Sequence, residues 1–138
     1  MTKLAEQLIV HEGMKLKPYR CTAGKLTIGV GRNLDDVGIS EEEAMIMLQN
    51  DIKTAEDELA RNHPWVVELD VVRRDVLTNM VFNMGITRVN KFVKTLAAVR
   101  SGDYEEAATE MLSSRWADQV GNRAHELAEQ MVSGEYAS

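Results

Sequence analysis

Apolar residues recur every three or four positions from Leu4 to Ile9, a spacing that predicts a helix at the start of the chain. Thr2 precedes this run and can cap the helix, because a threonine hydroxyl accepts a hydrogen bond from a free amide of the first turn. Gly13 follows the run, and glycine is common where a helix stops. We therefore expect the first helix to end at or beside Glu12.

The pattern changes between residues 14 and 34, where glycines separate short runs of β-forming residues. The tripeptide Thr22-Ala23-Gly24 is typical of a turn between two such runs. Pro18 lacks the amide proton that a helix interior would use. The segment thus predicts a small antiparallel hairpin or a three-stranded sheet.

A long helix is predicted next. Ser40 and Glu43 have the spacing of a capping box at its start, and His63-Pro64 should end it after about Arg61. Some twenty helical residues extend about 30 Å, which is long enough to join two lobes. The apolar side of this helix is predicted to consist of Ala44, Ile46, Met47, Leu48, Ile52, Ala55 and Leu59.

From Asp70 onward the pattern is helical almost throughout, with capping residues and glycines between the segments. Short connections between helices are typical of neighbouring antiparallel or crossed helices. The fold class we expect is α+β and mainly helical, with a small sheet early and a helical bundle late. The predicted helices are Val71–Met84, Asn90–Arg100, Tyr104–Leu112 behind Asp103, a short one around Arg115–Gln119, and Arg123–Val132.

Composition narrows the function classes. With 138 residues, 44% of them hydrophobic, the chain can bury a core as one domain, and it contains no apolar run of the about 20 residues that a membrane span needs. A glutamate near the start argues against a signal peptide. The net charge of −6 argues against nucleic-acid binding, although residues 1–38 carry +2 and residues 101–138 carry −6.

Metal and disulfide chemistry are not expected. The single cysteine, Cys21, has no partner for an internal bridge. His11, His63 and His125 are scattered, without the spacing of metal ligands, so we expect neither a metal nor another cofactor. The eight methionines stand at helical spacing and are expected to fill the core.

Three residues could share one chemical task. Glu12 at a helix end precedes Cys21 by nine positions, and Thr27 follows six positions later. A hairpin after the helix would place the carboxylic acid opposite the thiol and the hydroxyl, with room between them for a bond and a water. Glycoside hydrolysis needs such an acid and such a water-guiding group. From the spacing alone, a solvated helix terminus at Glu12 remains the alternative.

The same stretch resembles the signature of the T-even phage lysozymes, glycoside hydrolase family 24, whose endolysins cut bacterial peptidoglycan. That signature is a Glu, eight residues, an Asp or in some members a Cys, five residues and a Thr, followed by Ile-Gly-x-Gly. Glu12, Cys21, Thr27 and Ile28–Gly31 match it. Later segments that resemble the family in the same order are Val72–Arg74, Asn79–Gly85 and Arg115–Ala124, so the resemblance runs from about Leu8 to Tyr136.

The resemblance implies a single lysozyme-like domain over 1–138 with two lobes. Residues 14–60 would form the sheet lobe and the linking helix, and residues 1–13 would pack with 61–138 in the helical lobe. The implied substrate is bacterial peptidoglycan, and the bond is the β-1,4 link between N-acetylmuramic acid and N-acetylglucosamine. The implied stereochemical outcome is inversion, with retention through Cys21 as nucleophile left open.

The resemblance also implies roles for single residues. Glu12 would be the general acid, while Cys21 and Thr27 would guide the attacking water. Cys21 departs from the commoner Asp: it acts either as a thiolate near Lys25, Arg20 or His11, or as a neutral thiol that orients water. The alternatives for Cys21 and Thr27 are a small buried hydrophobe and an ordinary strand residue.

Supporting residues follow from the later segments. Phe82 and Thr95 would bind substrate, and Arg123 would pair with Glu12. The alternatives are a core phenylalanine, a threonine on a helix surface and an arginine in a surface ion pair. Arg32 could form an ion pair with Asp51 on the long helix, and the favoured alternative is an exposed pair.

Two other functions stay open at this stage. Cys21 with His11 as base could form a thiol amidase that attacks the peptide stem. The replacement of the commoner acid by Cys21 could also leave a catalytically weak module that only binds the wall. As an endolysin, the chain would be a monomer without membrane insertion, would stay in the host cytoplasm until lysis, and would depend on a separate holin-type membrane protein.

Overall fold

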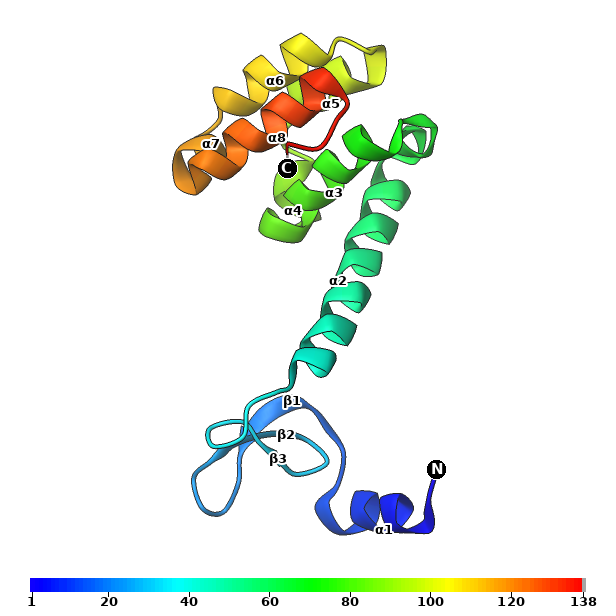
Figure 1. The fold of residues 1–138 in the computed structure, drawn as a ribbon, viewed down its shortest axis with the longest axis vertical. Coiled ribbons are helices and arrows are strands. Elements are labelled where there is room, and N and C mark those ends of the chain that lie inside the picture. Colours follow the sequence, from blue (N-terminus) through cyan, green and yellow to red (C-terminus); the bar gives the residue numbers. More distant parts are fainter. Residues whose placement is uncertain (138) are drawn as a thin grey trace. The chain divides into compact units, whose positions relative to one another are not determined.

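The structure is a computed structural model that describes residues 1–137. Over these residues the chain forms eight α-helices, one 3-10 helix and a three-stranded antiparallel sheet (Figure 1). The predicted fold class, α+β and mainly helical, is confirmed. The chain divides into two compact units, Met1–Met47 and the residues from Leu48 onward, and each is described by itself.

Helix α1 (Lys3–Glu12) opens the first unit and has the predicted ends. The Thr2 hydroxyl accepts a hydrogen bond from the Ala5 amide at 3.0 Å. Gly13 follows the last turn with φ +78°, a conformation that glycine adopts without the steric cost of a Cβ. The catalytic candidate Glu12 is therefore the last residue of the helix.

The sheet that follows consists of β1 (Lys15–Arg20), β2 (Leu26–Gly29) and β3 (Arg32–Asn33), in that order. Thr27 of the central strand faces Tyr19 on one side and Asn33 on the other. The β1–β2 turn is closed by hydrogen bonds from the Cys21 amide to the Lys25 carbonyl at 3.0 Å and from the Gly24 amide to the Cys21 carbonyl at 2.8 Å. The prediction of a small sheet is confirmed in its three-stranded form.

Helix α2 (Glu41–Asn62) begins in the first unit and ends in the second. Its capping box is present: the Glu43 amide donates to the Ser40 hydroxyl at 3.1 Å, and the Ser40 amide donates to the Glu43 carboxylate at 2.9 Å. The predicted apolar side is only partly buried. Ala55 and Leu59 are buried, whereas Ile46 and Met47 are more than half exposed.

The second unit holds the buried core, which the helices from the end of α2 to α8 build together (Figure 1). After α2 comes a 3-10 helix, η1 (Pro64–Glu68), and then α3 (Val71–Met84), whose bounds and terminal Gly85 match the prediction and which Asp70 caps. Among the methionines, Met80, Met111 and Met131 are fully buried and fill the core as expected. The prediction is wrong for Met1, Met14, Met45 and Met47, which are more than half exposed.

The predicted helix Asn90–Arg100 is wrong in its first turn. The chain forms a short helix α4 (Ile86–Val89), turns, and enters α5 (Val93–Ser101) only later. The Asn90 side chain donates to the Asn62 amide oxygen at 3.0 Å and lies 2.6 Å from Nε2 of His63. These tertiary hydrogen bonds hold Asn90 in a turn, which local helical spacing does not reveal.

The remaining helices are close to the predicted ones. They are α6 (Tyr104–Leu112) with its Asp103 cap, α7 (Arg115–Val120) and α8 (Asn122–Ser133). Trp116 of α7 is fully buried, and its indole donates to the Asn83 side chain at 2.7 Å. The helical unit therefore combines an apolar core with a few satisfied polar contacts.

Candidate active site

Glu12 rests on the backbone of Gly31 inside the first unit. A Cβ built on Gly31 would lie 3.0 Å from Oε2 of Glu12 and 3.4 Å from its Cδ and Cγ atoms. Gly31 itself has φ +70° and joins β2 to β3. The carboxylic acid at the end of α1 thus lies against the hairpin that also carries Thr27.

Cys21 and Thr27 lie together at the other end of β2, in the hairpin of β1 and β2. Thr27 is only 4% exposed, and its hydroxyl donates to the Lys25 carbonyl at 2.9 Å. Because a hydroxyl has one proton, its remaining lone pairs can accept a hydrogen bond from a water. Cys21 is partly exposed in the turn. The pair therefore offers an acceptor oxygen and a sulfur side by side.

Backbone hydrogen bonding lowers the pKa of the Cys21 thiol. The Lys25 backbone makes the largest contribution and the Ala23 backbone the next, desolvation opposes both, and the Thr27 hydroxyl contributes less. Two of the three candidate cations are engaged elsewhere, because Arg20 pairs with Asp35 and Lys25 with Asp36. The expected electrostatic source of a thiolate at Cys21 is thus replaced by amide hydrogen bonds.

Arg32 pairs with Glu43 inside the first unit, and its ion pair with Asp51 stays a prediction. Its guanidinium donates two hydrogen bonds of 2.9 Å to the Glu43 carboxylate and a third, of 3.0 Å, to the Gly38 carbonyl. Arg32 first, together with the Ser40 amide and hydroxyl, lowers the pKa of Glu43 to about 2. The loop before α2 folds back toward β3 and so brings Glu43 within reach of Arg32.

A pocket of about 740 Å³ in the first unit is lined by this ion pair and by the turn between β2 and β3. Val37, Ile39 and Ile46 supply apolar walls. Gly31 in this turn contacts Glu12, and the same turn forms part of the lining of the pocket.

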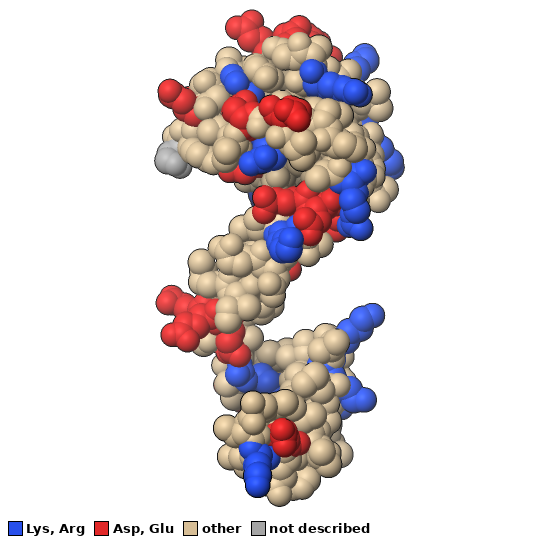
Figure 2. All heavy atoms as spheres, turned by 90° about the vertical axis from the view of Figure 1, so that its right-hand side faces the viewer, with Lys and Arg blue, Asp and Glu red and all other residues tan. Residues whose placement is uncertain are grey.

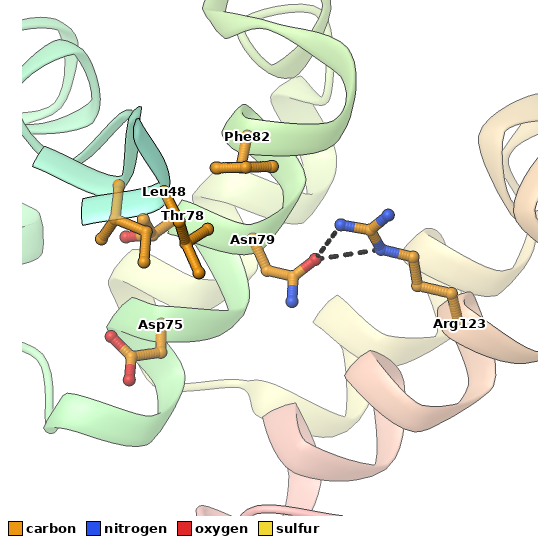
Figure 3. A pocket seen from close by; sticks show the side chains of 7 residues that line it. Leu48, Asp75, Thr78, Asn79, Phe82 and Arg123 are labelled. Atoms are coloured by element: carbon orange, nitrogen blue, oxygen red, sulfur yellow. Dashed lines mark hydrogen bonds between the residues drawn. The ribbon is translucent and has the colours of Figure 1, made fainter. Parts of the chain in front are cut away.

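Phe82 and Arg123 lie in a pocket of about 330 Å³ in the helical unit (Figure 3). Phe82 is 45% exposed, so the core alternative for this residue is wrong. Arg123 donates from Nε at 3.1 Å and from Nη2 at 2.7 Å to Oδ1 of Asn79. The contact with Asn79 was missed, although Asn79 stands three positions before Phe82, on the same face of α3. The pairing of Arg123 with Glu12 stays a prediction.

Thr95 lines another pocket of the helical unit, of about 400 Å³, together with Phe92, Glu110 and Ser114. Its exposed fraction is 2%, so it is not a threonine on an open helix surface. Its role in substrate binding stays a prediction.

Comparison with known proteins decides the family. The model of the phage lysozyme family matches residues 10–131. The chain belongs to the phage lysozyme family. The resemblance of the Glu12–Gly31 stretch and of the later segments is thereby confirmed, and this lysozyme is a glycoside hydrolase.

Curated relatives of this lysozyme include phage and eukaryotic proteins. "Probable T4-type lysozyme 2" of Dictyostelium discoideum is 28% identical, over 92% of this chain and 92% of that protein. The "Endolysin" of Acyrthosiphon pisum secondary endosymbiont phage 1 is 33% identical, over 82% of this chain and 77% of its own. The "SAR-endolysin" of Escherichia phage Mu is 31% identical, over 88% and 70% respectively.

The charges of the lysozyme are unevenly distributed. Figure 2 shows Lys and Arg side chains projecting from the sheet-bearing unit, and a cluster of acidic side chains near the start of α2, where Glu41, Glu42 and Glu43 stand. Acidic residues in a first helical turn are favourable because they face the positive end of the helix dipole.

Within residues 1–137, no helix is both long and apolar enough to cross a membrane. In the same part of the chain, no three His, Cys, Asp or Glu side chains are grouped as metal ligands.

Proposed function

We propose that this lysozyme is an endolysin with muramidase activity. Its substrate is bacterial peptidoglycan, and it hydrolyses the β-1,4 link between N-acetylmuramic acid and N-acetylglucosamine. Glu12 is the general acid, and Cys21 and Thr27 guide the attacking water. The observation that carries the proposal is that all three side chains belong to one helix–hairpin unit, with Glu12 resting on Gly31 and Cys21 beside Thr27.

The proposed reaction needs a proton at one side of the sugar and a held water at the other. Glu12 gives its proton to the glycosidic oxygen as the bond to the anomeric carbon breaks. The water forms the new bond to that carbon and loses a proton toward the sulfur or to solvent. Thr27 suits the holding role, because its hydroxyl donates to the Lys25 carbonyl and its oxygen can at the same time accept a hydrogen bond from the water.

Attack by water on the opposite face gives an inverted product, which is the outcome we propose. If Cys21 attacked the anomeric carbon itself, two displacements would leave the configuration retained. Proton NMR of the first product released from a soluble glycan strand separates the two outcomes. An α-configured reducing end supports water attack, and a β-configured end overturns it.

A digest of purified cell-wall sacculi tests the function. We expect turbidity to fall and new reducing sugar ends to appear, without new free amines. Free amines without reducing ends would instead support the Cys21 and His11 amidase. The lowered pKa of the Cys21 thiol favours the thiolate that this alternative needs as nucleophile. Sedimentation of the protein with sacculi and no loss of turbidity would support a wall-binding module.

The proposed cellular setting follows the family. The enzyme acts as a monomer, stays in the host cytoplasm until lysis and reaches the wall only after a holin-type protein opens the membrane. Expression in the cytoplasm should leave bacteria intact until the inner membrane is permeabilised chemically. Prompt lysis without permeabilisation would contradict this dependence.

A further inference from the structure

Gly31 differs from the other glycines in what it touches. All nine glycines have positive φ, and at seven of them an added Cβ would meet nothing within 4 Å. At Gly31 the added atom would meet the Glu12 carboxylate, and at Gly134 it would meet Arg73. The contact with Glu12 is therefore a specific feature of Gly31 and not a property of glycine turns in this fold.

The distances show that Glu12 uses the space that a side chain would fill. Carbon and oxygen atoms that are not bonded seldom approach as closely as the 3.0 Å between the added Cβ and Oε2. Any residue with a Cβ at position 31 would push the carboxyl away, since Glu12 is the mobile partner and Gly31 is part of the backbone.

No hydrogen bond within the first unit holds the Glu12 carboxyl in place; among the described residues of that unit, the close contact with Gly31 is what limits its position. The bare Cα of Gly31 therefore leaves room for Oε2 and limits how closely it approaches the hairpin. The position of Oε2 bears on catalysis because Thr27 lies four positions before Gly31, on the strand that leads into this turn.

We propose that Gly31 is a positioning residue for the hydrolysis: its missing side chain lets the Glu12 carboxyl lie on the hairpin and sets the distance between the acid and the water-guiding pair. The inference rests on the proposed role of Glu12 as the general acid. An added Cβ would displace the Glu12 carboxyl by a few tenths of an ångström, and because misplaced catalytic groups slow a reaction steeply, the effect of a single methyl should be measurable.

The test compares Gly31→Ala with Gly38→Ala. Both positions have nearly the same φ, +70° and +66°, so both substitutions impose similar backbone strain, but nothing lies within 4 Å of an added Cβ at Gly38. We expect kcat on soluble glycan strands to fall by about 5- to 10-fold in Gly31→Ala with KM within about twofold. In Gly38→Ala, kcat should stay within about threefold of the wild-type value at a similar loss of unfolding stability.

A second measurement reports the position of the Glu12 carboxyl without substrate turnover. The carboxyl carbon resonance of ¹³C-labelled Glu12, assigned with the Glu12→Gln variant, should move in Gly31→Ala and stay in place in Gly38→Ala. Equal losses of kcat in the two variants, an unmoved resonance, or a loss confined to KM would each overturn the inference.

The outcome of Glu12→Gln separates this inference from the proposed function. If Glu12→Gln keeps full activity, the proposed role of the acid fails. If Glu12→Gln is inactive while Gly31→Ala behaves like Gly38→Ala, the acid stands and only the positioning role of Gly31 is overturned.

Discussion

Arg123 of α8 and Asn79 of α3 are joined by two hydrogen bonds that end on the same amide oxygen. Forty-four positions separate the two residues in the sequence, so the contact ties two helices of the helical unit together. It also fixes the guanidinium at the edge of the pocket that contains Phe82 (Figure 3). Arg123 is thus held by a neutral partner in a defined orientation.

Replacing Asn79 with Ala should release Arg123 and lower the free energy of unfolding by about 1–2 kcal/mol, because hydrogen bonds from a charged donor are lost at a partly buried site. Urea denaturation measures this change. Asn122→Ala is the matched control, since among the described residues the Asn122 side chain bonds only to the exposed Glu126 one turn later. Equal effects of the two substitutions would contradict the account of Arg123.

The ion pair between Arg32 and Glu43 predicts how stability depends on pH. The pKa of Glu43 is about 2 in the folded chain, below the about 4.3 of an ordinary glutamate. The folded state therefore binds the proton less readily, so the contribution of Glu43 is present above about pH 5 and is lost as the pH falls toward 2.

Glu43→Gln tests this dependence through thermal unfolding between pH 2 and 7. Near neutral pH the wild type should be the more stable protein, and the difference should shrink as the pH approaches 2. Glu42→Gln, a neighbour that forms no ion pair in the described part of the chain, should show no such trend. A difference that stays constant over the whole range would contradict the assignment.

Arg73 holds the end of α8 through several contacts at once. It donates to the Met131 carbonyl at 2.7 Å and the Val132 carbonyl at 2.9 Å, and its guanidinium lies 3.7 Å from the centre of the Tyr104 ring. Lysine cannot reproduce this planar fork, so Arg73→Lys should cost about 1–2 kcal/mol of unfolding free energy. Arg74→Lys, at the adjacent position, should change the free energy of unfolding by no more than about 0.5 kcal/mol. A loss as large as that of Arg73→Lys would contradict the role given to the Arg73 contacts.

The lowered pKa of Cys21 makes a prediction about activity. If the thiolate guides the water, the rate should rise with pH through the thiol pKa, at a pH below the about 8.5 of a free cysteine. Cys21→Asp should remain active and lose this rise, because its carboxylate is already ionised there. Cys21→Ala should lower kcat by about 10- to 100-fold. Loss of all activity in Cys21→Asp would instead indicate thiol catalysis.

Local signals predicted most helix ends of this fold. Thr2 and Asp103 cap α1 and α6 as expected, and Gly85 and Gly102 stand where their helices stop. Each of these signals acts within one turn of helix, so the sequence contains all that is needed. Asn90 shows the limit, because its hydrogen bonds to Asn62 and His63 come from a distant segment.

In the candidate site, too, local contacts were predictable from the sequence and contacts between distant segments were not. A hairpin pattern was enough to expect Cys21 beside Thr27, since both flank one turn. The pattern could not show which groups shift the thiol pKa, nor that Arg32 meets Glu43, because both depend on the path of loops. The support of Arg123 by Asn79 joins two helices and has no local signal beyond the spacing of Asn79 and Phe82 on one face of α3.

The central claim is that Glu12 supplies the proton for cleavage of the glycan. Its most direct test is the rate at which Glu12→Gln releases new reducing ends from purified sacculi, with circular dichroism and urea unfolding showing that the fold is intact. The account predicts a rate at least about 100-fold below that of the wild type. A well-folded Glu12→Gln protein that cuts the wall at the wild-type rate would contradict it.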